Sequence, residues 1–247
     1  MRLTERIYLI GSGTVGGFNI SHPLDCNVYL LDGGEEMALV DAGAGVDIGP
    51  MLQNVRRVGL DPGKIRTLLL THKHADHSGG ASAWRRALGL HVMIAHDAVR
   101  VLETGDEEAI SLDVGKRSGT YPPDYRFHAC PVSRALRDGD VVKVGDLEVK
   151  VIETPGHCDG HLSFLVDEGG RSSLFAGDAL LHGGRIVLQN IPDCTIEGHR
   201  KSIYKLAALS FDGFFAGHAT FSVHEGKRHV DAAVRAFEAG GIPPLFA

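Results

Sequence analysis

The sequence has little of several features that would assign a protein quickly to a class. Its 247 residues include one Trp, five Tyr and four Cys, and no run of 18 apolar residues. No membrane-spanning helix is expected, therefore, and the first residues lack the apolar core of a signal peptide. The cysteines (Cys26, Cys130, Cys158 and Cys194) show no paired spacing. We interpret them as free thiols in a reducing cytoplasm, the location that we predict for the protein.

An excess of basic residues is absent as well. The formal net charge is −6, which argues against nucleic acid as a partner. Hydrophobic residues make up 43% and charged residues 23% of the chain, values that are ordinary for a globular protein. Because we find no linker, repeat or low-complexity segment, we predict a single domain over residues 1–247. We expect a small-molecule substrate, no membrane partner, and a homodimer as the commonest oligomer.

Short apolar runs alternate with amphipathic segments in both halves of the chain. Periodicity and turn signals predict helices at residues 46–58, 81–88, 98–102, 197–209 and 226–239, and strands or hairpins between them. This pattern favours two mixed β-sheets with helices outside over a doubly wound parallel sheet. Residues 103–135 are polar and contain two adjacent prolines, so we predict an irregular, substrate-facing insertion there.

A glycine-rich segment near the start, Gly11-Ser12-Gly13-Thr14-Val15-Gly16, matches the pattern GxGxxG after an apolar strand. That pattern binds a dinucleotide only where a helix begins inside it and presents its N-terminal amides. Gly17 and Pro23 prevent such a helix. We therefore predict a glycine-rich loop rather than a nucleotide site.

Histidine, in contrast to Tyr and Trp, is frequent, with 14 copies. The segment His72-Lys73-His74-Ala75-Asp76-His77 follows a predicted strand. Three more strands end in TPGH at residues 154–157, AGD at 176–178 and AGH at 216–218. Imidazole and carboxylate groups are ligands for Zn²⁺ or Fe²⁺, and burying them unpaired is costly. The sequence therefore predicts a metal site built from loops at the ends of strands.

These motifs, in this order and with Asp41-Ala42-Gly43 before them, resemble the metallo-β-lactamase superfamily. The resemblance covers residues 5 to 240. It implies an α+β fold, the αββα four-layer sandwich of the metallo-β-lactamase type, with two mixed β-sheets and helices on both outer faces. It also implies a dinuclear metal site, with two Zn²⁺ per chain expected and Fe²⁺ or Mn²⁺ as alternatives.

Roles for individual residues follow from their positions in the motifs. The resemblance implies that the first metal is bound by His72, His74 and His157, the second by Asp76, His77 and His218, and both by the bridging Asp178. Asp41 corresponds to the aspartate that orients a ligand histidine. His161 belongs to its motif without being a ligand.

The implied chemistry is hydrolysis. Two divalent ions about 3.5–4 Å apart hold a bridging water as hydroxide, which attacks a carbonyl. Asp76 is the catalytic residue expected to accept and pass on a proton.

The strings TPGHxxGH and GDALL are most similar to the glyoxalase II-like branch, which hydrolyses glutathione thioesters. We therefore predict a hydrolase that cleaves a thioester or a similar activated ester or lactone. The chain ends soon after His218, so we expect it to lack the helical glutathione-binding domain of that branch. Arg185 and His182 are candidate substrate-binding residues.

Two alternatives remain open. One is a lactone hydrolase of the N-acyl homoserine lactonase type, although that branch places a tyrosine where this chain has Leu181. The other is a mononuclear Fe persulfide dioxygenase, in which His72, His157 and Asp178 would form the two-histidine, one-carboxylate triad that suits O₂ chemistry.

Overall fold

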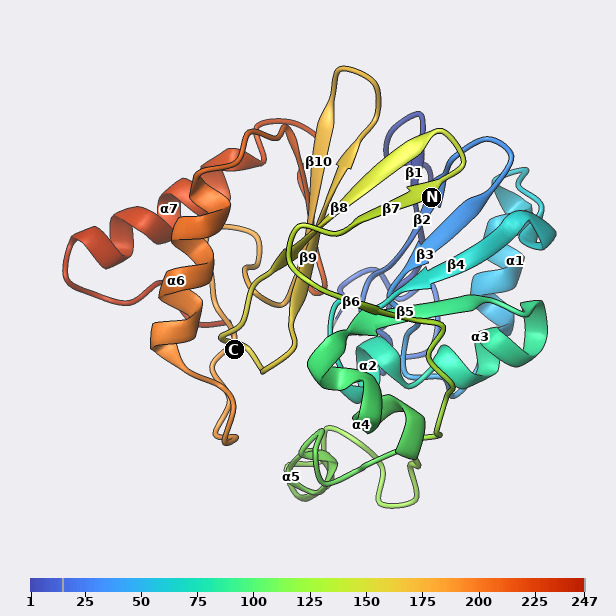
Figure 1. Cartoon of the computed structure of the whole chain (residues 1–247). Coiled ribbons are helices and arrows are strands. Elements are labelled where there is room, and N and C mark those ends of the chain that lie inside the picture. Colours follow the sequence, from blue (N-terminus) through green and yellow to red (C-terminus); the bar gives the residue numbers. More distant parts are fainter. Residues whose placement is uncertain (15, 247) are drawn as a thin grey trace. The chain divides into compact units, whose positions relative to one another are not determined.

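The computed structural model describes residues 1–14 and 16–246 (Figure 1). The chain divides into two compact units. The first unit contains Met1–Leu136 with Val144–Asp146, and the second contains Arg137–Lys143 with Leu147–Ala247. Val15 of the glycine-rich segment and Ala247 at the end of the predicted domain lie outside the described residues. That residues 1–247 act as one domain stays a prediction.

A six-stranded mixed sheet forms the centre of the first unit. Its order is β1 (Ile7–Gly11), β2 (Val28–Asp32), β3 (Met37–Val40), β4 (Ile65–Leu69), β5 (His91–Ala95) and β6 (Arg134–Leu136). β1, β2 and β3 pair antiparallel, whereas β3 to β6 pair in parallel. The carboxyl ends of β3 and β4 therefore lie at the same edge of the sheet, where ligand sites of such sheets form.

The helices of this unit are α1 (Gly49–Arg57), α2 (Ala75–Ser78), α3 (Ala81–Leu88), α4 (Val99–Thr104) and α5 (Leu112–Arg117), with 3₁₀ turns η1 (Pro62–Lys64) and η2 (His96–Ala98). α3 packs against β4 and β5. It ends at Gly89 in the left-handed conformation, with φ of 71°. Trp84 of α3 is fully buried, and its indole N–H donates to the Ala42 carbonyl at 3.1 Å. This bond ties α3 to the loop that follows β3.

The second unit is built on a five-stranded sheet. Its order is β11 (Gly213–Ala216), β10 (Ser172–Gly177), β9 (Leu162–Asp167), β8 (Leu147–Glu153) and β7 (Val141–Val144). β9 is antiparallel to both β8 and β10, and β10 is parallel to β11. β8, β10 and β11 consequently run in the same direction and end at the same edge.

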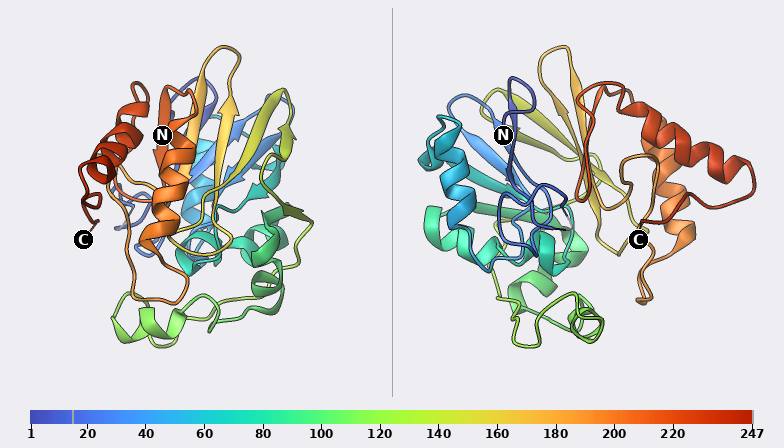
Figure 2. Two further views of the ribbon diagram at one scale, coloured as in Figure 1. Left: turned by 60° about the vertical axis from the view of Figure 1, so that its left-hand side comes forward. Right: turned by 180° about the vertical axis from the view of Figure 1, so that it is seen from behind.

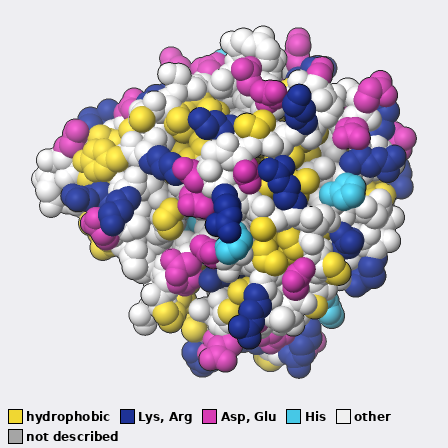
Figure 3. Space-filling model, in the orientation of Figure 1, with side chains coloured by type: hydrophobic (Ala, Val, Ile, Leu, Met, Phe, Trp, Pro, Cys, Tyr) yellow, Lys and Arg dark blue, Asp and Glu magenta, His cyan; other side chains and the backbone are white. Residues whose placement is uncertain are grey.

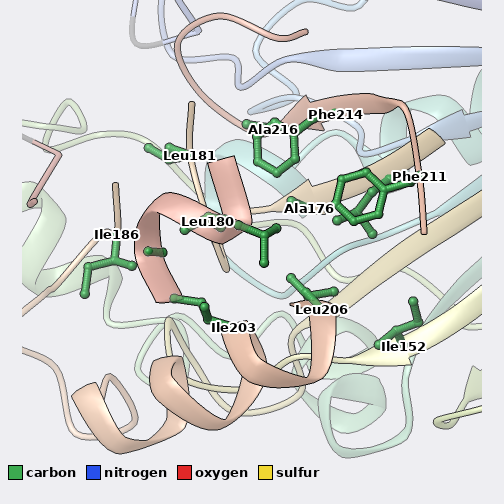
Figure 4. Packing of buried hydrophobic residues seen from close by; sticks show 13 residues of the cluster. Ile152, Ala176, Leu180, Leu181, Ile186, Ile203, Leu206, Phe211, Phe214 and Ala216 are labelled. Carbon is green, nitrogen blue, oxygen red and sulfur yellow. The ribbon is translucent and has the colours of Figure 1, made fainter. Parts of the chain in front are cut away.

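Helices α6 (Ile196–Ala207) and α7 (Lys227–Glu238) complete this unit and lie beside each other in both sets of views (Figures 1 and 2). Figure 4 shows the packing beneath them: Ile203 and Leu206, three residues apart on α6, lie in one cluster with Leu180 and Ile152. All four side chains are 3% exposed or less. Their spacing is that of one apolar helix face, and its burial fixes α6 against the segment after β10.

Most predicted elements are present within a few residues of their expected bounds. The glycine-rich segment is confirmed as a loop, since the described residues between β1 and β2 contain no helix. The prediction that 103–135 is irregular was wrong in part, because α5 forms over Leu112–Arg117 and β6 begins at Arg134. Gly115 inside α5 lowers helix propensity, and β6 is a three-residue edge strand, so both signals were weak.

The described part of the chain holds no helix with the length and hydrophobicity that a bilayer crossing needs. On the face drawn in Figure 3, Lys and Arg side chains alternate with Asp and Glu, without a large area of one sign.

Candidate metal centre

The HxHxDH segment forms a tight turn at the end of the buried strand β4. His72 and His77 are fully buried, and His74 is 8% exposed. The ring centroid of His72 lies 4.7 Å from that of His74 and 4.1 Å from that of His77. Three imidazoles thus lie close together in the protein interior, where polar groups are costly unless they are hydrogen-bonded or bind a metal.

Asp41, the residue directly after strand β3, organises this turn. Its Oδ1 accepts the Thr71 N–H at 2.8 Å, and its Oδ2 lies 2.8 Å from His77 Nδ1. The Thr71 hydroxyl contacts both carboxylate oxygens and lies 3.0 Å from His72 Nδ1. Because a carboxylate only accepts, His77 donates from Nδ1 and presents Nε2 on its other side. This is the carboxylate–histidine pairing of metal sites.

The backbone at Asp41 adopts an uncommon conformation. Its φ is 64°, in the left-handed region that Asp tolerates better than most residues. The loop that follows is held close to the HxHxDH turn: the Ala42 N–H donates to the His77 carbonyl at 2.7 Å, and the Gly80 N–H donates to the Gly43 carbonyl at 2.8 Å. A Cβ at Gly80 would lie 2.2 Å from the Ala42 carbonyl oxygen, so only glycine permits this approach.

Asp76 is only partly buried, with its side chain 20% exposed. Its Oδ2 lies 3.5 Å from His77 Nε2. Its Oδ1 accepts a hydrogen bond from the Tyr121 hydroxyl at 3.0 Å, and its backbone N–H donates to the same hydroxyl at 3.1 Å. Burial, and then the Asp76 carboxylate, raise the pKa of Tyr121 well above its ordinary value. Sequence reasoning missed Tyr121, because it stands in no motif and lies inside the polar insertion.

In the second unit, three candidate ligands follow the ends of β8, β10 and β11. His157, Asp178 and His218 are buried, each at most 5% exposed. Asp178 Oδ2 lies 3.2 Å from His218 Nε2 and 3.5 Å from His157 Nε2. Two histidine nitrogens therefore converge on one carboxylate oxygen. The Gly217 N–H donates to the Gly177 carbonyl at 2.8 Å and keeps the two loops side by side.

His161 supports Asp178 through the backbone. Its Nε2 accepts the Asp178 N–H at 3.0 Å, so its Nδ1 carries the proton and donates to Thr154 Oγ1 at 2.9 Å. The Thr154 hydroxyl in turn lies 2.8 Å from Ser163 Oγ. Both ring nitrogens of His161 are used in this network, which agrees with its assignment as a histidine that is not a ligand.

His199 on α6 is a second residue that sequence reasoning missed. It is fully buried, with Nδ1 3.2 Å from the Ala179 carbonyl and Nε2 3.2 Å from the Val187 carbonyl. Burial lowers its pKa to about 4. Gly156 of the TPGH motif, with φ of 136°, lies so close that a Cβ would meet the His199 backbone nitrogen at 2.2 Å. No spacing in the sequence signals this contact.

The two candidate substrate-binding residues lie in the loop after Asp178. The Arg185 Nε–H donates to the His182 carbonyl at 3.2 Å, and the guanidinium lies 5.2 Å from the ring centroid of Phe246. The Phe246 ring is stacked at 6.4 Å from that of His218. His182 is 4.2 Å, ring to ring, from His229, and burial lowers the pKa of both. Their part in substrate binding stays a prediction.

The donor atoms fit divalent metal ions. Each unit brings together part of the predicted set: Asp41, His72, His74, Asp76 and His77 in the first, and His157, Asp178 and His218 in the second. Nitrogen and carboxylate oxygen are the donors that Zn²⁺ and Fe²⁺ share.

All four cysteines are free thiols, as predicted. Cys26 lies close to Asp41 and His77: one candidate donor atom of each residue lies within 4.8 Å of the other two. Burial raises the pKa of its thiol, which keeps it protonated and a poor ligand.

Comparison with known proteins agrees with this geometry. The family model of the metallo-β-lactamase superfamily matches residues 22–218. An atrochrysone carboxyl ACP thioesterase of Aspergillus fumigatus is 26% identical over 87% of this chain and 56% of its own length. A hydroxyacylglutathione hydrolase of Rhodopseudomonas palustris is 31% identical over 63% of this chain and 49% of its own length. The chain thus spans about half the length of the curated relatives it matches.

Among solved structures, a metallo-β-lactamase mutant from Cronobacter sakazakii has a TM-score of 0.74 and 22% identity, over 97% of this chain and 95% of that one. The predicted fold class, two mixed sheets with helices in the metallo-β-lactamase fold, is confirmed by this likeness. On its fold, its motifs and the family match, the chain belongs to the metallo-β-lactamase superfamily.

Proposed function

We propose that this chain is a metal-dependent hydrolase that cleaves a thioester. The observation that carries the proposal is the convergence of His157 Nε2 and His218 Nε2 on one oxygen of Asp178, at 3.5 and 3.2 Å. A buried carboxylate between two imidazoles is suited to bridge two metal ions rather than to stabilise the fold.

The motif positions supply the full ligand set. In this proposal the first metal is held by His72, His74 and His157, the second by Asp76, His77 and His218, and Asp178 binds both. When bound, such ions polarise a carbonyl and lower the pKa of water. The Asp41 carboxylate keeps the proton of His77 on Nδ1, so that Nε2 is the donor atom.

Asp76 is the residue that we assign to proton transfer. It is the carboxylate of the first cluster that solvent reaches, and its Oδ2 faces His77 Nε2. A carboxylate there can take a proton from the attacking water and pass it to the departing group. A thiolate is a weaker base than an alkoxide, so the departing group of a thioester needs little protonation by Asp76.

A thioester is favoured over a lactone by two observations. The relatives named above are described as a thioesterase of an acyl carrier protein and a hydrolase of hydroxyacylglutathione, so both act on an acyl group bound to sulfur. Leu181, at the position where lactonases carry a tyrosine, is fully buried in the core of the second unit and carries no hydroxyl.

The test is a substrate panel with zinc-loaded protein: S-acyl glutathione, acyl-coenzyme A, S-acyl pantetheine, an N-acyl homoserine lactone and a cephalosporin. We expect turnover of at least one thioester, and a kcat lowered about 100-fold or more in Asp76→Asn with the first metal retained. The control is Asp25→Asn, a buried aspartate of the same unit, which accepts the Ala44 N–H at 2.8 Å. Turnover of the lactone alone would contradict the proposal.

The metal that supports activity and the need for O₂ distinguish the dioxygenase alternative from the hydrolase. Iron-loaded protein that consumes O₂ with glutathione persulfide, and cleaves no thioester, would replace the hydrolase assignment.

A further inference from the structure

Tyr121, in the insertion over residues 103–135, bonds the side chain of Asp76 in the metal-binding turn. We propose that Tyr121 is a positioning residue for Asp76, which sets the direction of its carboxylate toward the second metal. The inference rests on the proposed role of Asp76 as metal ligand and proton acceptor. It gives the insertion a part in building the site, beyond facing the substrate.

The contact is a two-point clamp on one residue. The Tyr121 hydroxyl accepts the Asp76 backbone N–H at 3.1 Å and donates to Asp76 Oδ1 at 3.0 Å. The Tyr121 hydroxyl oxygen thus fixes the position of the Asp76 side chain relative to its own backbone. The two carboxylate oxygens become unequal: Oδ1 is turned to the phenol, and Oδ2 faces His77 Nε2 at 3.5 Å.

Tyr121 is itself held firmly by the insertion. Its N–H donates to the Gly115 carbonyl of α5 at 3.2 Å, and a Cβ at Gly115 would lie 2.8 Å from the Tyr121 ring. The ring also lies 5.0 Å from that of Tyr125. Glu107 braces the segment from its other side, because it accepts the Phe127 N–H at 3.0 Å and lies 3.1 Å from Lys116 Nζ. A fixed phenol loses little entropy when it bonds a carboxylate, which is what a positioning group requires.

Tyr125 provides a matched control within the same segment. It is buried like Tyr121, at 8% against 9% exposure, and its hydroxyl also bonds next to the site. That hydroxyl donates to the Ala44 carbonyl at 2.8 Å and lies 3.5 Å from the Ala75 carbonyl, so its hydrogen bonds are to the backbone. Tyr121→Phe and Tyr125→Phe each remove one buried hydroxyl and keep the ring, yet only the first removes a bond to the Asp76 side chain.

The experiment measures metal binding directly, by titration of the metal-free chain with Zn²⁺ against a chelating dye, and with Co²⁺ by its absorption spectrum. For Tyr121→Phe we expect the second equivalent of metal to bind about 10- to 100-fold more weakly, the first equivalent to bind as in the wild type, and the Co²⁺ spectrum of the second site to change. Tyr125→Phe should leave both affinities unchanged. Where thioester turnover is measurable, Tyr121→Phe should lower kcat and leave KM unchanged.

A double-variant cycle tests whether Tyr121 acts through Asp76. In an Asp76→Asn background, Tyr121→Phe should cause no further loss of metal affinity. The proposal is overturned if Tyr121→Phe binds both equivalents like the wild type, if Tyr125→Phe causes the same loss, or if the wild type binds only one equivalent. A wild-type chain that binds two metals but cleaves no thioester refutes the proposed function instead, and the titration still decides the role of Tyr121.

Discussion

The strongest test of the site geometry is the substitution Asp41→Asn. Asp41 is 2% exposed, and its carboxylate contacts the Thr71 N–H, the Thr71 hydroxyl and His77 Nδ1. Asparagine has the same shape and also tolerates a φ of 64°, so the backbone is not strained further. The amide oxygen can still accept from Thr71. The amide nitrogen, however, is a donor, and it then faces His77 Nδ1.

That change reverses the proton position of one ligand. With a donor opposite Nδ1, His77 carries its proton on Nε2, the nitrogen that is to bind the metal. We expect a second-metal affinity lower by about 10- to 100-fold, or about 1.4–2.7 kcal/mol, in line with other partners of metal-binding histidines. Loss of the charged hydrogen bond should cost about 1.5–3 kcal/mol of unfolding free energy in the metal-free chain.

Titration with Zn²⁺ and urea denaturation of the metal-free chain measure the two effects separately. Asp25→Asn is the control, since it changes another buried aspartate of the unit that bonds the Ala44 N–H. A second-metal affinity equal to that of the wild type in Asp41→Asn would refute the argument that Asp41 sets the proton position of His77.

Other substitutions test the second unit. Asp178→Ala should remove turnover and tight metal binding together, and a variant that keeps both metals and full activity would exclude a bridging role. Gly156→Ala should lower the free energy of unfolding by about 2 kcal/mol or more, because its φ is 136° and the new Cβ would meet the His199 backbone; an unchanged urea midpoint would contradict this. The pKa of His199 is about 4 in the folded chain and lies below its unfolded value. The neutral side chain therefore contributes fully to the free energy of unfolding above pH 6.5, and this contribution is lost as the pH falls toward 4. In chelator, the wild type should therefore lose about 2 kcal/mol more than His199→Gln between pH 7.5 and pH 5, and equal losses would refute the assignment.

Much of the fold was predictable because local signals agreed with one another. β3, β4 and β10 are short strands rich in apolar residues, and a chemically distinctive motif stands at or shortly after the end of each. Parallel pairing then places the ends of β3 and β4 side by side in one sheet, and the ends of β10 and β11 side by side in the other. The sequence pattern does not give this pairing.

The rest depends on contacts between residues far apart in the chain. Tyr121 meets Asp76 across 45 positions, and no periodicity or spacing signals that bond. His199 is buried by the packing of α6, although the charged residues beside it in the sequence are typical of a solvent-exposed helix. α5 was missed because Gly115 weakens its propensity, although that glycine leaves room for the Tyr121 ring.

Elemental analysis of the chain purified without added metal, with stoichiometry per chain, distinguishes a two-metal hydrolase from a one-iron dioxygenase. We expect about two equivalents of Zn, or of Zn mixed with Mn or Fe. About one equivalent of Fe with little Zn would contradict the two-metal hydrolase and favour the persulfide dioxygenase.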